Sequence, residues 1–228
     1  MNSMNQDTVD TASLVRPLID TSLLLARGAS YKKLAPEEVL FAEGDRCDFY
    51  YQVARGQIRW VNFNKEGDEY LQTLVEKGEC IGELPLFDSG SYAATAIATK
   101  ASLVLRLPRE AFHQLLVDEP QIHFAFSNLL TQRLRFKFFL LKEIANNNPE
   151  KIISSLLSYL HEKKDHVCSM CGQVRLTRKQ IAEMAGLRVE TVIRVMRTLN
   201  EKGVIQIRNR KAYFGNSMEC DSRRCVAG

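Results

Sequence analysis

The chain has 228 residues, of which 45% are hydrophobic and 25% are charged, a composition typical of a soluble folded protein rather than a disordered or membrane-spanning one. This length accommodates two domains, because a single domain usually holds about 100 to 200 residues. It contains no apolar run of about 18 residues, the length that crosses a bilayer. The only apolar cluster near the N-terminus, residues 23–26, is too short for a signal peptide. We therefore expect a cytoplasmic protein without a membrane partner.

Charge is distributed unevenly along the chain. Residues 150–228 contain 15 Lys and Arg against 8 Asp and Glu, whereas residues 1–149 contain 16 against 19. A basic domain attached to a mildly acidic body is expected when one part of a protein neutralises phosphates and the other does not. Charge alone also fits an ordinary solvated basic surface.

The first half of the chain has the pattern of a β unit. Glycines fall at 44, 56, 67, 78 and 90, and short β-branched and aromatic segments lie between them, a spacing that indicates hairpins. Residues 57–63 and 70–75 are predicted strands joined by a turn at 65–68. We predict a β-roll or jelly roll over residues 30–118, preceded by an N-terminal segment, residues 1–29. The fold class is α+β.

After Pro108 the pattern becomes helical, with a short helix over 109–117 and a long one within residues 119–146. Apolar residues recur along the long helix in a narrow stripe that suits a parallel seam with a second copy of the chain. Packing of the stripe on the β unit is the alternative. The stripe comprises Leu130, Leu134, Phe138, Leu141 and Ile144. Asn146–Pro149 ends the helix, so a second unit is expected over residues 149–228.

Residues 177–202 predict two crossed helices. Thr177 is a suitable N-cap, Gly186 permits a left-handed turn, and the second helix runs from about Val189 to Lys202. Apolar residues hold the two helices together: Ile181, Met184, Ala185, Val192, Val195, Met196 and Leu199. An ordinary helical hairpin fits this periodicity as well as a helix-turn-helix does.

The polar positions of the second helix suit base recognition. Arg194 is able to contact guanine with two hydrogen bonds, and Glu190 to accept from the cytosine amino group. Their spacing of four also allows Glu190 to hold the Arg194 side chain. A basic hairpin around Asn209 follows as the predicted wing of a winged helix. The candidate DNA-binding residues are Thr177, Arg178, Arg188, Val189, Glu190, Thr191, Arg194, Arg197, Arg208, Arg210 and Lys211.

The chain resembles the CRP/FNR regulators over nearly its whole length. The resemblance rests on Gly82–Phe87 (G-E-L-P-L-F), the long helix, and the V-E-T-V-I-R run at 189–194. It implies a sensor β-roll, a homodimer, double-stranded DNA and RNA polymerase as partners, and no enzymatic activity. In that family the Glu and Arg of E-T-x-x-R read a G:C pair, which assigns this role to Glu190 and Arg194. Val189 matches the FNR branch and favours a TTGA-like half-site over TGTGA, but Ile193 replaces the Ser common in that branch.

The resemblance also implies an effector pocket in the β-roll. The candidate residues are Gly82, Glu83, Leu84, Ala93, Ala94, Leu134 and Phe138. Cyclic-AMP binders of the family have an Arg-Ser pair where this chain has Ala93 and Ala94, and Thr-Ser where it has Lys137 and Phe138. A phosphate without its Arg loses a contact of about 1.5 to 3 kcal/mol. We predict no tight cyclic-AMP binding, and the effector stays unidentified.

The six cysteines divide into two groups. Cys168 and Cys171 form a C-x2-C before a predicted strand at 173–176, and Cys220 and Cys225 follow the wing. Antiparallel pairing of the wing strands would bring both pairs to one edge, where four thiolates suit zinc or an iron–sulfur cluster, with His166 as an alternative ligand. A reversible disulfide and ordinary thiols are the alternatives to a metal site. Cys47 and Cys80 are expected to be thiols of the β unit.

Two further alternatives concern function. The FNR oxygen-sensing cluster uses N-terminal cysteines, and this chain has none before Cys47, so that role does not transfer. A metal- or haem-dependent gas or redox sensor remains open, although no residue indicates haem. A cupin-like enzyme is disfavoured because residues 30–108 contain no His-rich metal set.

Overall fold

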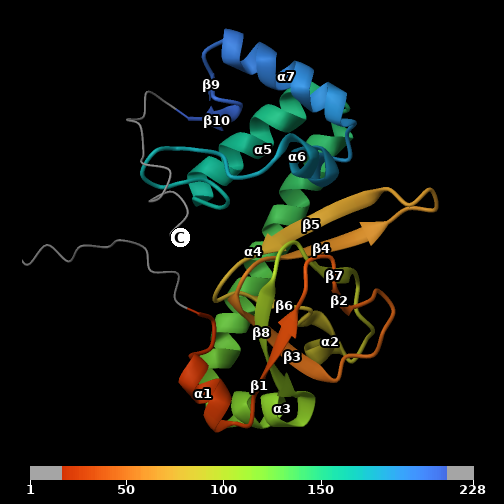
Figure 1. Cartoon of the computed structure of the whole chain (residues 1–228), viewed down its shortest axis with the longest axis vertical. Helices are drawn as coiled ribbons and strands as arrows, with labels where there is room; N and C mark the ends of the chain where they lie inside the picture. The colour runs from red at the N-terminus through yellow and green to blue at the C-terminus, as the bar shows by residue number, and fades with distance from the viewer. Residues whose placement is uncertain (1–16, 215–228) are drawn as a thin grey trace, which may run out of the picture.

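A computed structural model describes residues 17–214. A β-sandwich at one end of the molecule and a helical unit at the other are joined by one long helix (Figure 1). This arrangement confirms the predicted α+β class. No helix within the described residues is long and apolar enough to cross a membrane.

The β unit consists of two four-stranded antiparallel sheets, with strand orders β1-β8-β3-β6 and β2-β7-β4-β5. Its strands are β1 (Ser30–Leu34), β2 (Val39–Phe41), β3 (Phe49–Arg55), β4 (Ile58–Phe63), β5 (Glu69–Val75), β6 (Cys80–Ile81), β7 (Thr95–Ala98) and β8 (Ser102–Pro108). The two strands predicted at 57–63 and 70–75 are β4 and β5, which pair from Ile58↔Val75 to Phe63↔Glu69.

The helices and wing strands follow the predicted order. They are α1 (Thr21–Ala26), α2 (Leu84–Asp88), α3 (Arg109–Asp118), α4 (Pro120–Ala145), α5 (Pro149–Lys163), α6 (Arg178–Ala185), α7 (Val189–Glu201), β9 (Gln206–Arg208) and β10 (Lys211–Tyr213). The two short helices α1 and α2 were not predicted, since six and five residues carry little periodicity. α1 begins at an Asp20 cap, whose carboxylate accepts from the Ser22 N–H at 2.8 Å.

The main core lies between the two sheets and is closed by α3 and the start of α4. Tyr50, on β3, stacks on Phe112 of α3 with ring centroids 4.9 Å apart, and its ring meets Phe126 of α4 edge-on at 5.9 Å. All three side chains are fully buried. The first two turns of α4 are therefore part of the β-unit core, which anchors the long helix at this end.

A second apolar cluster joins the β unit to the helical unit. The sheet β2-β7-β4-β5 shares one buried cluster with side chains of α5, α6 and α7. Its residues in the cluster are Val61, Leu71, Leu74 and Ile97. The β4–β5 hairpin lies directly beneath α6 in Figure 1, and α6 contacts β5. Burial of apolar surface between the units fixes the orientation of α6 relative to the sheet. No sequence pattern predicted this contact.

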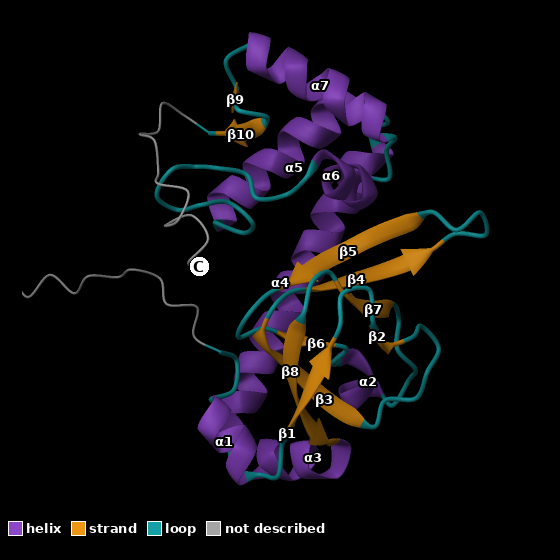
Figure 2. Ribbon diagram, in the orientation of Figure 1, coloured by secondary structure: helices purple, strands orange, loops and turns teal. Residues whose placement is uncertain are grey.

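The strand predicted at 173–176 does not form. Val174 and Gln173 make only isolated bridges, to Val167 and to Tyr213, and the connection between α5 and α6 is drawn as loop in Figure 2. Too few consecutive backbone pairs form for a ladder, because the chain turns sharply at Cys168–Gly172, where the Gly172 N–H donates to the Cys168 carbonyl at 2.8 Å.

Candidate DNA interface and effector site

The two helices α6 and α7 meet in a helix-turn-helix. Thr177 caps α6 in a reciprocal capping box, its hydroxyl accepting from the Gln180 N–H at 3.1 Å while the Gln180 side chain accepts from the Thr177 N–H at 2.8 Å. Gly186 ends α6 in the left-handed region, with φ of 64°. The predicted apolar faces of both helices are buried. The local sequence signals thus produce the turn that sets the angle between the helices.

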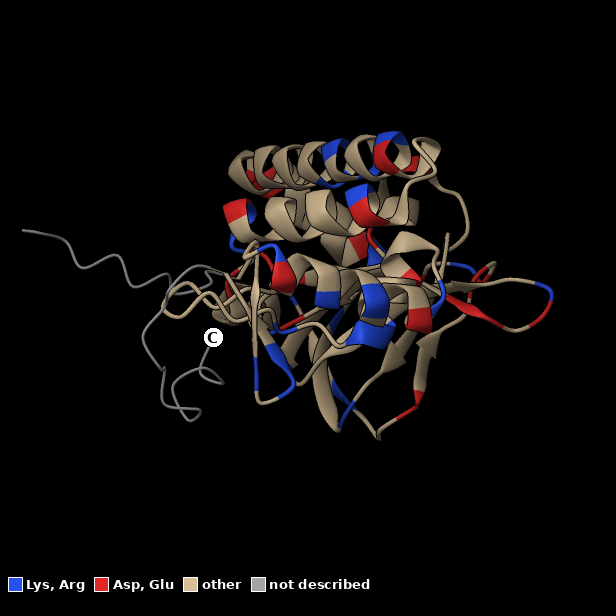
Figure 3. Cartoon of the chain, turned by 90° about the horizontal axis from the view of Figure 1, so that it is seen from above, with Lys and Arg blue, Asp and Glu red and all other residues tan. Residues whose placement is uncertain are grey.

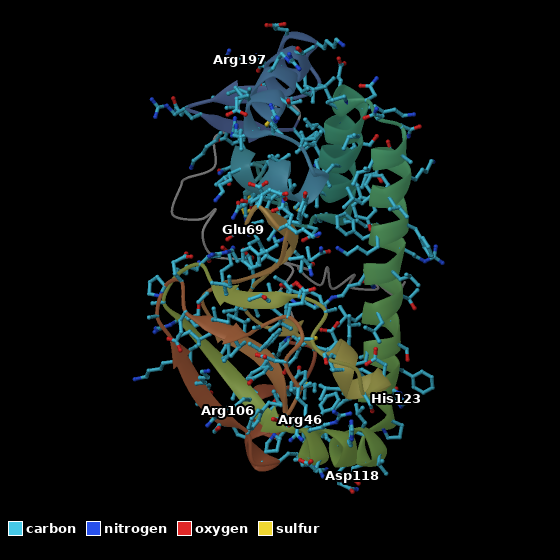
Figure 4. The ribbon with its side chains drawn as sticks, turned by 90° about the vertical axis from the view of Figure 1, so that its right-hand side faces the viewer. Arg46, Glu69, Arg106, Asp118, His123 and Arg197 are labelled. Atoms are coloured by element: carbon cyan, nitrogen blue, oxygen red, sulfur yellow. The ribbon has the colours of Figure 1, made fainter. Side chains whose placement is uncertain are left out.

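The polar face of α7 points away from the β unit. α7 lies at the top of Figure 1 and Arg197 at the far end from the β-sandwich in Figure 4, whereas Glu69 lies where the two units meet. Four predicted contact residues of this region are exposed, and Val189 and Thr191 are half-buried. The exposed ones are Arg188, Glu190, Arg194 and Arg197. This face is therefore accessible to a double helix without any movement of the β-sandwich within the same chain.

Glu190 and Arg194 do not hold one another. The expected ion pair across one helical turn is absent from those recorded between residues 17 and 214. Glu190 lies in the first turn of α7, where the helix dipole favours an acidic side chain. Each side chain can therefore contact a partner separately.

Ile193 is an additional residue on the accessible face. Its side chain is 38% exposed, next to Arg194, although it is branched and apolar. Sequence reasoning noted it only as a departure from the family pattern. Its exposure distinguishes it from the apolar side chains of α7 that serve the core, which are buried.

The wing is a tight antiparallel hairpin tied to α7. Arg208 pairs with Lys211 across the turn, and the Asn200 side chain accepts from the Ile207 N–H at 2.7 Å. Asn209 and Arg210 both have positive φ, 48° and 64°, as a two-residue primed turn requires. The three cationic residues predicted for phosphate contact, Arg208, Arg210 and Lys211, are exposed.

The charge of this end of the molecule is mixed. Viewed from above, basic and acidic residues alternate over the helices instead of forming one continuous basic surface (Figure 3). Thr177 is exposed, and Arg178 is half-buried so that burial lowers its pKa. Any phosphate binding here depends on individual basic side chains.

The residues predicted for the effector pocket lie in two places. Gly82, Glu83 and Leu84 are at the end of β6 and the start of α2, where Gly82 has a φ of 71°. A Cβ on Gly82 would lie 2.5 Å from Phe41 Cζ and 2.8 Å from Tyr92 Cε1. Phe41 and Tyr92 are stacked with centroids 3.7 Å apart. Glycine is required here because two aromatic rings press against the backbone.

Glu83 is bound by a residue that the sequence analysis missed. Its side chain is fully buried and forms an ion pair with Arg133 of α4. The Arg133 Nη2 also donates to the Cys80 carbonyl at 2.9 Å, and its guanidinium lies 5.8 Å from the centre of the Trp60 ring. Burial alone would lower the pKa of Arg133, but the charge and hydrogen bond of Glu83, together with contributions from Cys80 and Glu79, raise it. Glu83 and Arg133 are 50 residues apart, so no local sequence pattern predicts that they form an ion pair.

Ala93 and Ala94 sit where the family's phosphate contacts are expected. The Ala93 carbonyl accepts from the Asn62 side chain at 2.8 Å, and the Ala94 carbonyl from the Trp60 Nε1 at 3.1 Å. Neither side chain offers a charge or a hydroxyl. The other predicted pocket residues, Leu134 and Phe138, are 54% and 64% exposed on α4, so within one chain they point to solvent and not into the β-roll.

The apolar stripe of α4 is largely uncovered. Leu141 and Ile144 are exposed together with Leu134 and Phe138, whereas Leu130 is half-buried. Phe124, at 72% exposure, extends the exposed set toward the start of the helix, fourteen residues or four turns before Phe138. The sequence analysis missed Phe124 because the polar residues Ser127 and Thr131 separate it from the rest of the stripe. Among the described residues, only Leu130 at the start of the stripe is partly covered. Packing of the stripe on its own β unit therefore does not explain it.

The cysteines of the described region are all buried. Cys168 and Cys171 form a small cluster with Tyr213 at the end of the wing, at the edge expected for them, while Cys220 and Cys225 lie outside the described residues. His166 is buried, and its Nε2 lies 3.5 Å from Asp165 Oδ1. Cys47 and Cys80 lie in the β-unit core, where burial raises the pKa of both thiols. Within residues 17–214 no three candidate ligands meet in a metal site.

Comparison with known proteins now identifies the family. A cyclic nucleotide-binding domain model matches residues 31–119, and a Crp-like helix-turn-helix domain model matches residues 150–214. The cyclic AMP receptor protein of Thermus thermophilus is 30% identical over 188 residues, which cover 80% of this chain and 83% of that protein. The chain belongs to the CRP/FNR family of DNA-binding transcription regulators.

A second curated protein and two solved structures are also similar to this chain. The cAMP-activated global transcriptional regulator CRP of Salmonella typhimurium is 25% identical over 76% of this chain and 83% of its own length. The c-di-GMP responsive regulator CLP of Xanthomonas campestris shares the fold, with a TM-score of 0.69 and 20% identity over 86% of this chain and all of that chain. FixK2 of Bradyrhizobium japonicum has a TM-score of 0.67 and 17% identity over 87% and 96%. The matching family models and the curated relatives are transcription regulators and not enzymes, which removes the cupin-like alternative.

Proposed function

We propose that the protein is a homodimeric regulator that binds a palindromic TTGA-like DNA site through α7 and responds to an effector other than cyclic AMP. The observation that carries the proposal is the accessible face of α7, on which Glu190 and Arg194 are both exposed. Arg194 donates to guanine in the major groove and Glu190 accepts from cytosine. Arg208, Arg210 and Lys211 of the wing bind phosphates and set the register of the helix.

The exposed stripe of α4 supports the homodimer. Five large apolar side chains along a 26-residue helix remain uncovered in the single chain, and a second copy of the same helix would bury them in a parallel seam. They are Phe124, Leu134, Phe138, Leu141 and Ile144. A two-fold dimer would present two recognition helices to half-sites one helical turn of DNA apart, about 34 to 36 Å.

The β-roll supports a sensor that does not use cyclic AMP. Several relatives are named for cyclic AMP, but here Ala93 and Ala94 offer no bidentate phosphate contact. The effector would instead bind in the β-roll beside the Glu83–Arg133 ion pair, in which Arg133 neutralises the Glu83 charge. Two connections would carry its signal: α4, which holds Arg133, and the β4–β5 hairpin, which packs on α6. RNA polymerase is the expected downstream partner of the bound dimer.

DNA binding is tested by fluorescence anisotropy with labelled duplexes. The wild type should prefer a TTGA-type palindrome over a TGTGA-type one, and Arg194→Ala should lose about 1 to 3 kcal/mol of binding free energy and discriminate less at one base pair. Arg46→Ala is the matched control, because the Arg46 side chain is 84% exposed in the β unit, far from α7 (Figure 4). Equal binding by the wild type and Arg194→Ala would contradict the proposal.

Dimerisation is tested by light scattering. Leu134→Asp combined with Leu141→Asp should give a folded monomer, since both side chains are exposed in the single chain and the charges oppose only the seam. Gln132→Asp changes an exposed position two residues before Leu134, off the stripe, and this variant should stay dimeric. A monomeric wild type, or a dimeric double variant, would reject the seam.

A further inference from the structure

The first strand of the wing, β9, starts from a fixed point just after α7. Gly203 has a left-handed conformation, with a φ of 72°, and the chain reverses there as the Val204 N–H donates to the Leu199 carbonyl at 2.9 Å. Ile205 follows, 1% exposed, in the core of the helical unit. The turn of the hairpin at 209–210 is exposed. Backbone and burial therefore fix where the wing starts, and a further contact is needed to fix its direction.

The wing hairpin is bound along both of its edges. β9 and β10 are antiparallel, with Ile207 opposite Ala212. The Ala212 carbonyl accepts from the Val174 N–H at 2.8 Å, so at this pair the backbone of β10 points away from β9. In an antiparallel pair, two opposed residues direct their backbone groups either at one another or both outward. The Ile207 N–H therefore points away from β10, and the Asn200 Oδ1 accepts from it at 2.7 Å.

Asn200 joins the recognition helix to the wing. It lies in the last turn of α7, six residues or about 9 Å along the helix after Arg194. Its partner, Ile207, directly precedes Arg208 on β9. The Asn200 side chain is exposed, so burial gives no reason for its place. The hydrogen bond thus connects the element that carries the base-reading arginine to the element that carries the phosphate-binding one.

We propose that Asn200 is a positioning residue for DNA binding: its Oδ1 holds β9 against the end of α7, so that the wing reaches phosphates while Arg194 contacts a base. This inference rests on the proposed role of the wing in DNA binding. A hairpin that is fixed before binding loses less conformational freedom on the DNA, so its contacts contribute more to affinity. Asn200 acts through the cations of the hairpin, Arg208, Arg210 and Lys211.

A direct contact between Asn200 and a phosphate is the competing explanation. Since Oδ1 faces the Ile207 N–H, the amide N–H groups of Asn200 are left to donate elsewhere. The two roles differ in one respect. A positioning residue loses its effect when the cations that it positions are removed, whereas a direct contact keeps its effect. A double-mutant cycle therefore separates the two roles.

The test combines Asn200→Ala with a neutral wing, Arg208→Gln with Lys211→Gln. Binding to a TTGA-type duplex is measured by fluorescence anisotropy over a range of salt concentrations. Asn200→Ala alone should weaken binding about three- to tenfold and lower the salt slope by about one, as expected when one phosphate contact is lost. In the neutral wing, the same substitution should change the affinity by less than about twofold. Circular dichroism should be unchanged, because alanine favours the helix more than asparagine does.

Amide hydrogen exchange in the free protein gives a readout that does not involve DNA. The Ile207 amide should exchange faster in Asn200→Ala than in the wild type, because it has lost its acceptor. Asn200→Asp keeps an acceptor oxygen, so its Ile207 amide should remain protected. Glu201→Gln, at the adjacent exposed position of the same turn, is the matched control and should exchange like the wild type.

Three results would overturn this inference alone: an equal loss of affinity from Asn200→Ala in both wings, wild-type affinity and salt slope in Asn200→Ala, or an Ile207 amide that exchanges at the wild-type rate in that variant. A neutral wing that binds DNA like the wild type would reject the wing contacts of the proposed function and, with them, this inference. A loss that appears only when the wing cations are present would support the positioning role.

Discussion

Arg133 of α4 binds the fully buried carboxylate of Glu83 in the β-roll. This pair connects the helix that carries the exposed apolar stripe to the segment that the family uses for its effector. Arg133 remains 24% exposed, so the pair lies at the edge of the core, where an effector could compete for either partner.

Removing Arg133 should strongly destabilise the β unit. Arg133→Ala leaves a buried carboxylate without its counter-ion, which costs about 3 to 5 kcal/mol. The free energy of unfolding, measured with urea, should fall by that amount. Combining Arg133→Met with Glu83→Gln should recover most of the loss. An unchanged midpoint in Arg133→Ala would show that the pair contributes little.

Cyclic AMP should bind weakly, and two substitutions should strengthen its binding. Calorimetry of the wild type should show no sub-micromolar affinity, because Ala93 and Ala94 provide no phosphate contact. Ala93→Arg with Ala94→Ser adds a charge-assisted contact of about 1.5 to 3 kcal/mol, so the dissociation constant should fall at least tenfold. Ala93→Lys with Ala94→Ser is the control, since a lysine lacks the bidentate geometry. Tight binding by the wild type would contradict the effector assignment.

Ile193 should read a thymine methyl group. Its exposed side chain neighbours Arg194 on the accessible face of α7, and an apolar contact with the methyl is worth about 1 kcal/mol. Replacing thymine by deoxyuridine at one position of the half-site should weaken wild-type binding by that amount. Ile193→Ser should be insensitive to the same change. If deoxyuridine scanned through the half-site has no effect on the wild type, Ile193 makes no such contact.

Arg210 should contribute to DNA binding at a cost in stability. Its φ of 64° strains any residue with a side chain, by about 1 kcal/mol. Arg210→Gly should raise the free energy of unfolding by up to that amount while weakening DNA binding and lowering the salt slope by about one. Asn209→Gly changes the same turn without removing a charge, so its DNA affinity should match the wild type. Unaltered affinity in Arg210→Gly would place the wing away from the phosphates.

The sequence was sufficient to predict those elements whose ends and faces are encoded by neighbouring residues. A cap at Thr177, a left-handed glycine at Gly186 and apolar positions three and four apart are encoded within a few residues, so α6, α7 and the wing were predicted almost to their ends. The strand at 173–176 was wrong because strand formation depends on a partner, and the tight turn at Cys168–Gly172 leaves room for only isolated bridges.

What the sequence by itself determined was the order of the elements, the family resemblance and which residues of α7 are polar. Only the tertiary structure decided that Arg133 neutralises Glu83, that the β4–β5 hairpin packs on α6, that Phe124 extends the exposed stripe, and that Leu134 and Phe138 face solvent within one chain. These contacts join residues far apart in the chain. Their energy comes from burial and charge pairing in three dimensions, for which no short sequence period exists.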